Sequence, residues 1–397
     1  MNKIGNISGK KILLLQGPMG MFFSNLDKLF RKNGATTFRI GFNAGDWIFA
    51  NKDHYIPYRD SIDNWESFIE KFFIQNHIDK VFLMGDCRVY QSIAIKVAQQ
   101  LNIETYVFEE GYVRPNYITL EKWGVNNFSL IPRDKYFYQN LSENDYKHQD
   151  DLPTNPSFFK MALSASIYYL FAYFGKFRYP HYIHHRDLHP LKEFGYGIRN
   201  FYRKYLYKVL EYKKQDYIIQ KKFFFVPLQT YNDFQIKTHS DFNTIEEFIK
   251  IVITSFALNK PNKDIYLVFK HHPMDRGRKN YTKYIYQLSK NLNIENQIIV
   301  VHDLHLPTLL SHTLGTITIN STVGLQALYH DSPVKVLGNA IYDIDGLCDQ
   351  KPIDYFWENP MKPDRELFEK FRGYLINNTQ INCSFYGKGI ENMEIFK

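Results

Sequence analysis

The sequence predicts an α/β protein with two domains, each built on a mainly parallel sheet with helices on both faces. Three observations lead to this class. The chain has 397 residues, well above the size of one typical domain. Short apolar runs alternate with segments of helical spacing. This alternation stops at about residue 133 and restarts at Phe223, which indicates two α/β halves separated by an insertion.

The first half begins with a strand at residues 11–16, where an apolar run ends at Gly17 and Pro18. A helix follows at 22–32 and ends near Gly34. Further strands are expected at 36–40, 80–84 and 104–108, and further helices at 65–77 and 90–101. Because parallel strands bind ligands at their carboxyl ends, we expect the loops 16–18, 41–46, 85–88 and 109–115 to converge at one sheet edge.

The second half repeats the pattern. Its expected strands are 223–227, 264–269, 297–301, 315–319 and 334–337, and its expected helices are 244–256, 280–291, 306–312, 320–329 and 365–376. We therefore expect an N-terminal domain at 1–222 with a helical insertion at about 150–222, a C-terminal domain at 223–350, and a tail at 351–397 that packs back on the first domain. Two such domains sharing a cleft match the GT-B architecture, which sugar-binding proteins and some epimerases also match.

Composition restricts the class of protein. The aromatic content of 17% is high, and three cysteines are too few and too scattered for a disulfide framework or a zinc site. The polar N-terminal residues lead straight into a strand, so we expect no signal peptide. The most apolar window, 161–174, is shorter than the ~20 residues that span a bilayer. A soluble or peripheral protein in a reducing cytosol is expected.

The net charge of +8 is confined to one segment. Residues 176–222 hold 12 Lys or Arg and four Asp or Glu, an excess of 12 − 4 = +8, so the remainder is neutral. A charge restricted to one aromatic insertion, without a recognised motif, argues against nucleic-acid binding. Tyr and Phe between the cations suit an anionic membrane surface, and a solvated insertion that only covers the sheet is the alternative.

Two adjacent carboxylates, Glu109 and Glu110, follow the expected strand at 104–108 and precede Gly111. Neighbouring carboxylates repel each other, so one of them can hold its proton near neutral pH and act as an acid or base. For an isolated Glu-Glu-Gly, a solvated acidic turn is the simpler interpretation. The weight of this motif therefore depends on the rest of the chain.

Lys270, His271, His272 and Pro273 follow a strand of the second half. An ammonium and an imidazole at a strand end suit a phosphate leaving group. Two adjacent His point in different directions, which argues against a paired metal site. A His-rich surface loop explains this motif equally well when it is taken alone.

Asn320, Ser321, Thr322 and Gly324 begin a helix directly after another strand. Ser and Thr at this position are ordinary helix caps, yet free N–H groups, the helix dipole and two hydroxyls also make an anion site. Together with the motif at 270–273, they indicate a phosphate-bearing donor in the second half.

No metal site is expected. Asp343 and Asp345 form an Asp-x-Asp pattern, which holds a metal in some glycosyltransferases, but it lies late in the chain and such short patterns recur by chance. The histidines lack ligand spacing with matching carboxylates or thiols, and no glycine-rich nucleotide motif is present.

With these elements placed, the sequence resembles the bacterial capsule polysaccharide biosynthesis family, and within it the KpsS-type β-Kdo transferases. The resemblance runs from residue 12 to about 340 and rests on the order and spacing of short stretches. These are Leu-Gln-Gly-Pro-Met-Gly at 15–20 with Phe-Phe at 22–23, Asn-Ala-Gly-Asp at 43–46, Gly-Asp-Cys-Arg at 85–88, Glu-Glu-Gly-Tyr-Val-Arg-Pro at 109–115, Pro-Leu-Gln at 227–229, His-Pro at 272–273 and Asn-Ser-Thr-Val-Gly at 320–324.

The resemblance implies a GT-B-like enzyme, peripheral on the inner face of the cytoplasmic membrane, that works beside other capsule biosynthesis and export proteins. It implies CMP-Kdo as donor and transfer of the first β-Kdo residue of a linker to a phosphatidylglycerol-type lipid. Glu109 or Glu110 would supply the acid or base, and His272, Ser321 and Thr322 would hold the CMP phosphate. Because a CMP-sugar leaves with one phosphate, no metal or other cofactor is expected.

Kdo carries a carboxylate, so the donor pocket needs a cation, for which Arg88 and Arg114 are candidates. The candidate residues for binding the CMP-sugar are Gly17, Pro18, Arg88, Arg114, Lys270, His272, Pro273, Asn320, Ser321, Thr322 and Gly324.

Transfer of β-Kdo from a β-linked donor proceeds with retention, which a carboxylate nucleophile would allow. The candidates are Glu110, Glu109, Asp86 and Asp233. Two other functions stay open: a nucleotide-sugar epimerase or hydrolase of GT-B fold that needs no lipid, and a non-catalytic capsule-assembly protein that binds the lipid through the basic segment.

Overall fold

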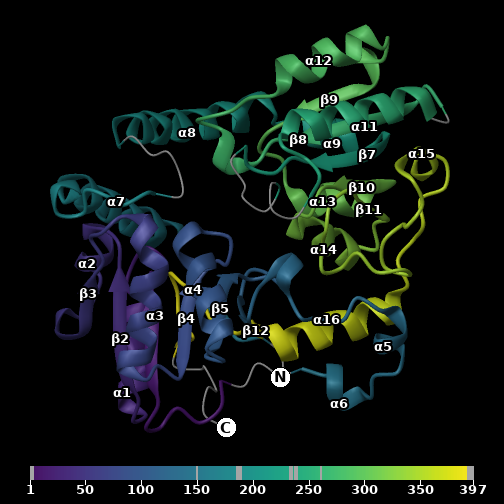
Figure 1. The fold of residues 1–397 in the computed structure, drawn as a ribbon. Coiled ribbons are helices and arrows are strands. Elements are labelled where there is room, and N and C mark those ends of the chain that lie inside the picture. The colour runs from purple at the N-terminus through teal and green to yellow at the C-terminus, as the bar shows by residue number, and fades with distance from the viewer. Residues whose placement is uncertain are drawn as a thin grey trace. The chain divides into compact units, whose positions relative to one another are not determined.

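The computed structural model describes residues 4–148, 151–184, 190–231, 236, 240–259 and 262–390 (Figure 1). It divides into two compact units, each with its own sheet. The first unit comprises Met1–Leu130, Glu143–Pro190 and Gly373–Lys397, and the second comprises Ile131–Ser142 and Leu191–Arg372. The chain therefore passes from one unit to the other at four points.

A seven-stranded sheet forms the first unit, in the order β12-β6-β5-β4-β1-β2-β3. The strands from β5 to β3 in this order pair in parallel, and β6 and β12 add an antiparallel edge. The strands are β1 (Lys11–Leu15), β2 (Thr36–Gly41), β3 (Tyr55–Pro57), β4 (Lys80–Met84), β5 (Glu104–Glu110), β6 (Ile118–Lys122) and β12 (Gln380–Ile381).

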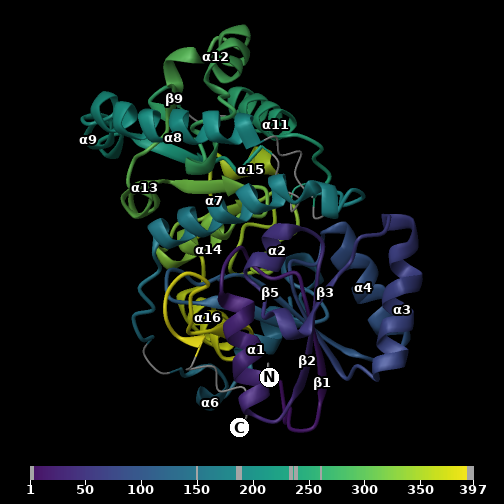
Figure 2. The same cartoon turned by 90° about the vertical axis from the view of Figure 1, so that its left-hand side faces the viewer.

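Both faces of this sheet are buried, and the side chains of each strand alternate between them. Ile12 and Leu14 of β1 lie in the core beneath α1, whereas Leu13 and Leu15 lie in the core beneath α3 and α4. Figure 2 shows α1 on one side of the sheet and α3 and α4 on the other. The helices of this unit are α1 (Phe22–Lys32), α2 (Ala44–Ile48), α3 (Trp65–Asn76), α4 (Val89–Gln100), α6 (Glu143–Tyr146) and α7 (Phe158–Phe174).

A five-stranded, fully parallel sheet forms the second unit, in the order β11-β10-β7-β8-β9. The strands are β7 (Lys222–Pro227), β8 (Ile265–Lys270), β9 (Ile298–Val301), β10 (Gly315–Thr318) and β11 (Val334–Val336). The helices that lie wholly or mostly in this unit are α5 (Lys135–Gln139), α8 (Pro190–Leu210), α9 (Lys214–Ile219), α11 (Ile245–Asn259), α12 (Thr282–Asn291), α13 (Leu306–His312), α14 (Thr322–Tyr329), α15 (Ile353–Phe356) and α16 (Arg365–Thr379).

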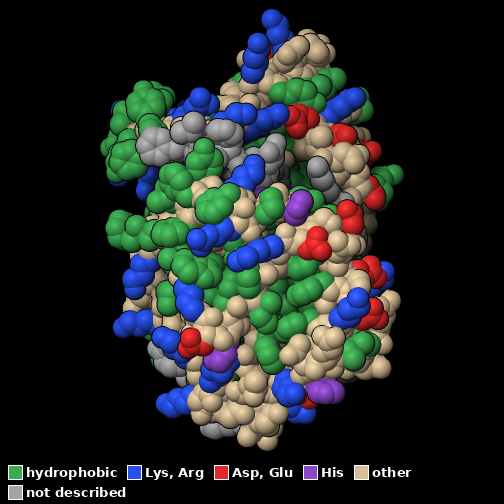
Figure 3. All heavy atoms as spheres, turned by 60° about the vertical axis from the view of Figure 1, so that its left-hand side comes forward, with side chains coloured by type: hydrophobic (Ala, Val, Ile, Leu, Met, Phe, Trp, Pro, Cys, Tyr) green, Lys and Arg blue, Asp and Glu red, His purple; other side chains and the backbone are tan. Residues whose placement is uncertain are grey.

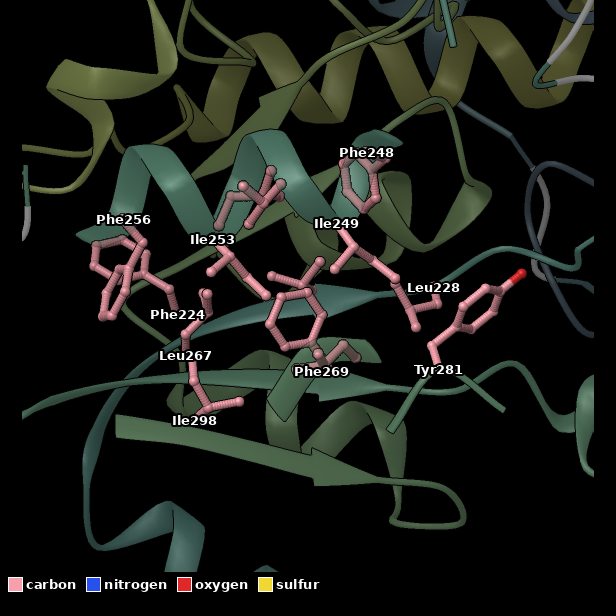
Figure 4. Close-up of a cluster of buried hydrophobic side chains, with 14 of the residues drawn as sticks. Phe224, Leu228, Phe248, Ile249, Ile253, Phe256, Leu267, Phe269, Tyr281 and Ile298 are labelled. Atoms are coloured by element: carbon pink, nitrogen blue, oxygen red, sulfur yellow. The ribbon is translucent and has the colours of Figure 1, made fainter. Parts of the chain in front are cut away.

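The core of the second unit lies between its sheet and α11. Ile249 and Ile253 of α11 face Leu267 and Phe269 of β8, and all four side chains are buried (Figure 4). The spacing of four residues between Ile249 and Ile253 places both on one helical face, as the sequence pattern indicated.

The predicted α/β class with two Rossmann-type sheets is confirmed. The helix at 22–32, the strand at 80–84 and the helix at 306–312 have the predicted bounds. The short elements α2, β3, β6 and β12 were not predicted. Within the described part of the chain, every helix is too short or too polar to traverse a bilayer.

The compact units divide the chain differently from the expected domains. Residues 191–222, which were expected to belong to the first domain, group with the second sheet, and only 373–397 of the expected tail group with the first. The reason lies at the end of α8, where the carboxylate of Glu211 accepts hydrogen bonds from the backbone amides of His302 and Asp303, each at 3.0 Å. These bonds fix the end of the basic helix to the strand end of β9.

Candidate functional site

Glu109 and Glu110 are the last two residues of β5 and do not begin a loop. The antiparallel strand β6 pairs Glu109 with Thr119 and Glu110 with Ile118. The prediction that the strand ends at residue 108 is therefore wrong, because pairing with β6 extends it. Both carboxylates are carried by backbone that belongs to the sheet.

The carboxylate of Glu109 has an altered proton affinity. Burial is the main cause that raises its pKa to about 7, and the neighbouring carboxylates of Glu110 and Asp86 act in the same direction. The amide of Glu110, which donates to Glu109 Oε1 at 3.0 Å, and the guanidinium of Arg88 oppose this rise. A pKa near 7 leaves both protonation states populated at neutral pH, which suits a general acid or base.

Gly85 lies between Arg88 and Glu109 at the carboxyl end of β4. Its φ is +71°, a conformation that glycine adopts without strain, and a Cβ here would lie 3.5 Å from Arg88 Nε and 3.7 Å from Glu109 Oε2. Its amide donates to Phe108 O at 2.9 Å. The structure thus brings the predicted Arg88 and Glu109 to one place on the sheet edge.

Asp86 is buried, and both of its carboxylate oxygens accept hydrogen bonds. Val125 N donates to Oδ2 at 2.8 Å, and Cys87 Sγ donates to Oδ1 at 3.0 Å. This arrangement holds the loop after β6 and favours a structural role for Asp86 over the predicted catalytic one. The fourth catalytic candidate, Asp233, lies outside the described residues.

Glu121 of β6 is a buried carboxylate that sequence reasoning missed. Burial raises its pKa to about 7, and Asp86 adds to this rise. Tyr112 donates its hydroxyl to Glu121 Oε1 at 2.7 Å, and Ser129 donates to Oε2. The alternation of apolar and polar residues at 118–121 is the signal that would have found the strand and this residue.

The remaining candidates of the first unit have different surroundings. Arg114 is exposed, and its Nε donates to Gly111 O at 3.1 Å. Pro18 is buried, and a Cβ at Gly17 would collide with the ring of Phe23. Packing alone therefore explains the glycine at 17.

The stretch at 43–46 contacts α7. Asn43 and Asp46 form a capping box at the start of α2, and the hydroxyl of Tyr168 donates to Asp46 Oδ1 at 3.0 Å. Asn43 Nδ2 donates to the same hydroxyl at 2.7 Å, and Gln16 Nε2 donates to Asp46 Oδ2 at 3.2 Å. Burial raises the pKa of Asp46. This polar network holds α7 on the first unit.

At the end of β8 the two adjacent histidines have separate environments. His271 is buried, its Nε2 accepts from Tyr281 N at 2.8 Å, and burial lowers its pKa to about 3. His272 Nδ1 accepts from Met274 N at 3.2 Å, so the neutral ring carries its proton on Nε2. Pro273 begins the short turn that follows, and burial lowers the pKa of Lys270.

The motif at 320–324 begins α14. Ser321 caps the helix, since its Oγ accepts from Val323 N at 3.2 Å, and Thr322 is the first helical residue. A Cβ at Gly324 would collide with the hydroxyl of Tyr342, which donates to Ser321 O. Glycine at 324 is thus required by the packing of this helix end.

Both motifs of the second unit lie at the same sheet edge. The strands β8 and β10 flank β7, and all three are parallel, so residues 270–273 and 320–324 lie at strand ends on either side of β7. Gln229, which follows β7, joins them: its Nε2 donates to Asn320 Oδ1 at 2.9 Å, and its Oε1 accepts from Asn320 N at 3.3 Å. Sequence reasoning placed Gln229 only in the family resemblance.

Among the residues that the structure describes, no group of three or more His, Cys, Asp or Glu is arranged to hold a metal ion. Within the Asp-x-Asp pattern, Asp345 forms an ion pair with Lys135, and Asp343 Oδ1 accepts from Gln350 Nε2 at 3.0 Å.

The protein therefore belongs to the class of α/β proteins with two Rossmann-type units. One unit carries carboxylates at a strand end, and the other carries a helix N-terminus there. Over residues 79–386 the chain matches the family described as capsule polysaccharide biosynthesis protein, and it belongs to that family, as predicted. It is 40% identical over 383 residues to the capsule polysaccharide export protein KpsS of Escherichia coli, covering 96% of this chain and 98% of the relative.

A second relative is the capsule polysaccharide modification protein LipB of Neisseria meningitidis serogroup B, with 41% identity over 399 residues, 98% of this chain and 94% of the relative. Among solved structures, the β-Kdo 2,7 transferase KpsC of Thermosulfurimonas dismutans is similar with 15% identity and a TM-score of 0.43, over 93% of this chain and 92% of that one.

Proposed function

We propose that the protein is a retaining glycosyltransferase that adds the first β-Kdo residue from CMP-Kdo to a phosphatidylglycerol-type lipid in the synthesis of a capsule linker. Membership of the capsule polysaccharide biosynthesis family supports the pathway. The observation that carries the reaction is Glu109, a carboxylate with a pKa of about 7 on a sheet edge beside Arg88.

In the proposed first step, ionised Glu109 attacks the anomeric carbon of Kdo. A bond forms between a carboxylate oxygen and that carbon, while the bond from the carbon to the phosphate oxygen breaks and CMP leaves with the electron pair. In the second step the lipid hydroxyl attacks the same carbon, gives up its proton to a base and restores the carboxylate. Two inversions give retention. Glu110 is the second candidate for the nucleophile.

The second unit would bind the phosphate of the donor. His272 presents an N–H at Nε2, Ser321 and Thr322 lie at the N-terminus of α14, and Lys270 ends the strand β8 that His272 follows. The leaving group is a single phosphate, so these groups would neutralise it without a metal ion.

Contact with the anionic inner leaflet would bring the enzyme to its lipid. The helix α7 exposes Phe159 and Phe174 at 73% and 67%, and α8 exposes Phe201 and Tyr202 at 66% and 63%. Figure 3 shows exposed hydrophobic side chains beside Lys and Arg. Aromatic rings among cations suit the interface, and each Lys or Arg near it contributes about 1 kcal/mol of attraction.

The decisive experiment is incubation with CMP-Kdo and a phosphatidylglycerol analogue, with mass detection of the lipid product. We expect a product one Kdo heavier than the analogue and β-configured, and a Kdo adduct on the enzyme when the acceptor is omitted. Absence of an adduct in wild type and all carboxylate variants, together with an inverted product, would overturn the proposal that a carboxylate acts as nucleophile.

The same assay separates the other candidate functions. Release of CMP that does not depend on the lipid would indicate an epimerase or hydrolase. A non-catalytic assembly protein is indicated if Glu109→Gln and Glu110→Gln both support full capsule formation in cells.

A further inference from the structure

The first unit contains a pocket of about 230 Å³ that the proposed reaction does not use. It lies where the loop after α2 meets β3 and the turn after α7. The residues that line it are Ala44, Trp47, Lys52, Tyr55, Pro57, Arg59, Arg178 and Tyr179. Three of these are cations, three are aromatic and none is acidic.

The cations of this pocket lie against aromatic rings. Lys52 Nζ is 3.9 Å from the centroid of the Trp47 ring, and the guanidinium carbon of Arg59 is 5.8 Å from that of Tyr179. Partial burial lowers the pKa of Lys52, and the positive charge of Arg39 lowers it further. The three cations make the lining positive, and the carboxylate of Asp46, which interacts with Tyr55 and Tyr179, opposes this charge in part.

The volume restricts the ligand. Pockets for drug-sized ligands measure roughly 300–1,000 Å³, and a nucleotide sugar belongs to that size class. A pocket of about 230 Å³ fits a smaller anion, such as one phosphate diester. The hydroxyls of Tyr55 and Tyr179, 3.3 Å apart, add hydrogen-bonding groups to this wall of the pocket.

The pocket adjoins the apolar helix of this unit. Arg178 ends the turn η4 (Lys176–Arg178), which follows α7 after Gly175, and α7 packs on α2. Figure 1 shows α2, β3 and α7 on the same side of the first unit. Phe174 and Phe177 are 67% and 76% exposed, and Trp47 is 37% exposed. The exposed rings suit a ligand with apolar chains, and the cations beside them suit an anionic group. A phospholipid at a membrane surface has both.

We propose that this pocket binds the phosphate of an anionic membrane phospholipid, with the exposed rings of Phe174 and Phe177 in the acyl layer beside it. The site is separate from the carboxylates of β5 and would hold the first unit on the leaflet. The inference rests on the membrane contact of the proposed function. Its test contains no CMP-Kdo, so its outcome is independent of the transfer reaction.

The test measures binding of the full chain to phosphatidylcholine vesicles with and without one third phosphatidylglycerol. The variant K52Q/R59Q/R178Q removes the three cations, all of which are exposed, so the fold should tolerate the changes. We expect each lost cation to weaken binding to the anionic vesicles about fivefold, the equivalent of ~1 kcal/mol, and binding to neutral vesicles to stay the same.

A matched control removes the same charge elsewhere on this unit. The variant K28Q/K71Q/K96Q replaces exposed lysines of α1, α3 and α4. If it weakens binding to anionic vesicles as much as the pocket variant does, general electrostatics explains the attraction and the pocket proposal is overturned. Unchanged binding of K28Q/K71Q/K96Q, together with weaker binding of the pocket variant, supports the pocket.

Soluble competitors distinguish a lipid from a free phosphate compound. We expect inorganic phosphate and glycerol 3-phosphate at millimolar concentration to leave vesicle binding within twofold of its starting value. Displacement of the protein from vesicles by micromolar amounts of either compound would assign the pocket to a soluble phosphate compound. It would overturn the proposal that the pocket binds a phospholipid.

Discussion

Glu109 and Glu121 lie on the adjacent antiparallel strands β5 and β6, and the pKa values of both are raised to about 7, mainly by burial. The carboxylate of Asp86 raises both, so the three acids share one region of negative potential. Glu121 is held by the hydroxyls of Tyr112 and Ser129. Glu109 accepts its hydrogen bond from the neighbouring backbone amide, which leaves its side chain better suited to react with a substrate.

Replacement of Glu109 by Gln should lower the turnover number by roughly 10⁶, the scale of loss when a covalent nucleophile is removed. If ionised Glu109 is the reacting form, wild-type turnover should rise as pH increases through about 7 and level off above it. In the comparison variant Glu110→Gln the rise should persist but occur at a lower pH, because the carboxylate of Glu110 no longer raises the pKa of Glu109. A wild-type profile that is flat between pH 6 and 8 would contradict the role of Glu109.

Glu121 should make the protein less stable as pH rises. Its pKa is about 7 in the folded state and ordinarily 4.5, so its contribution is complete below about pH 4.5 and is lost as pH increases through 7. This difference in pKa corresponds to about 3 kcal/mol. In urea unfolding at pH 5 and pH 8, Glu121→Gln should show a smaller pH dependence than wild type. Equal dependence would show that Glu121 ionises as readily in the folded state as in the unfolded one.

The helix α7 is apolar, with one face packed on the protein and the other exposed. Tyr168 is its buried residue, and its hydroxyl bonds to Asp46 and Asn43. The outward face carries Phe159 and Phe174, and the helix contains no acidic residue. The inner face fixes the helix to the sheet edge, and the outer face is available to a membrane.

Tyr168→Phe should destabilise the first unit by about 1–3 kcal/mol, because it leaves buried hydrogen-bonding groups of Asp46 and Asn43 without the hydroxyl. Thermal unfolding followed by circular dichroism measures this loss. Tyr173→Phe is the control, since Tyr173 is 50% exposed and its hydroxyl can bond to water. Equal melting temperatures for the two variants would show that the network contributes nothing.

Phe159→Ser and Phe174→Ser should weaken binding to neutral and anionic vesicles by the same factor, at least tenfold, since burying a Phe side chain contributes about 1.5–3 kcal/mol. The control Ile74→Ser changes a residue of α3 that is 54% exposed and should leave vesicle binding unchanged. Loss of binding only to anionic vesicles would mean that α7 does not enter the apolar layer.

Local sequence patterns predicted the parallel strands other than β3 as short apolar runs. They did not predict β6, which pairs with residues 106–110 of β5, and they ended β5 at residue 108. They also could not show that Asp46 bonds to Tyr168, because 122 residues separate the two and no periodic pattern reports such a contact. Of the candidate site, Arg88 and Glu109 were predicted by type and position. Glu121 was missed although the alternation at 118–121 marks its strand, and the bond of Gln229 to Asn320 is a tertiary contact that no local pattern reports.

At the scale of the whole molecule, the chain carries a net charge of +8, and the excess lies in residues 176–222. Most of this segment groups with the second unit, while Arg178 belongs to the first. The expected domain boundary at 222 missed this division, since composition changes along the segment while the contacts that assign it, such as those of Glu211, are distant in sequence.

Binding to anionic vesicles should weaken strongly between 0.1 and 1 M salt, because the screening length falls from ~10 Å to ~3 Å. Binding to neutral vesicles should change little, since it depends on the apolar face of α7. Vesicle sedimentation at both salt concentrations measures the electrostatic and the apolar contributions to binding. Equal salt dependence on both kinds of vesicle would contradict an electrostatic contribution from the basic segment.

The extension of β5 has a consequence for any chemistry at Glu109. The backbone of this residue is fixed by the ladder with β6, and the preceding Phe108 is paired with Met84 of β4. No loop has to close to position the backbone of this carboxylate. The conformational entropy of fixing that backbone is therefore lost during folding and not on substrate binding. The sheet edge is therefore preorganised, and its reorganisation during a reaction would be small.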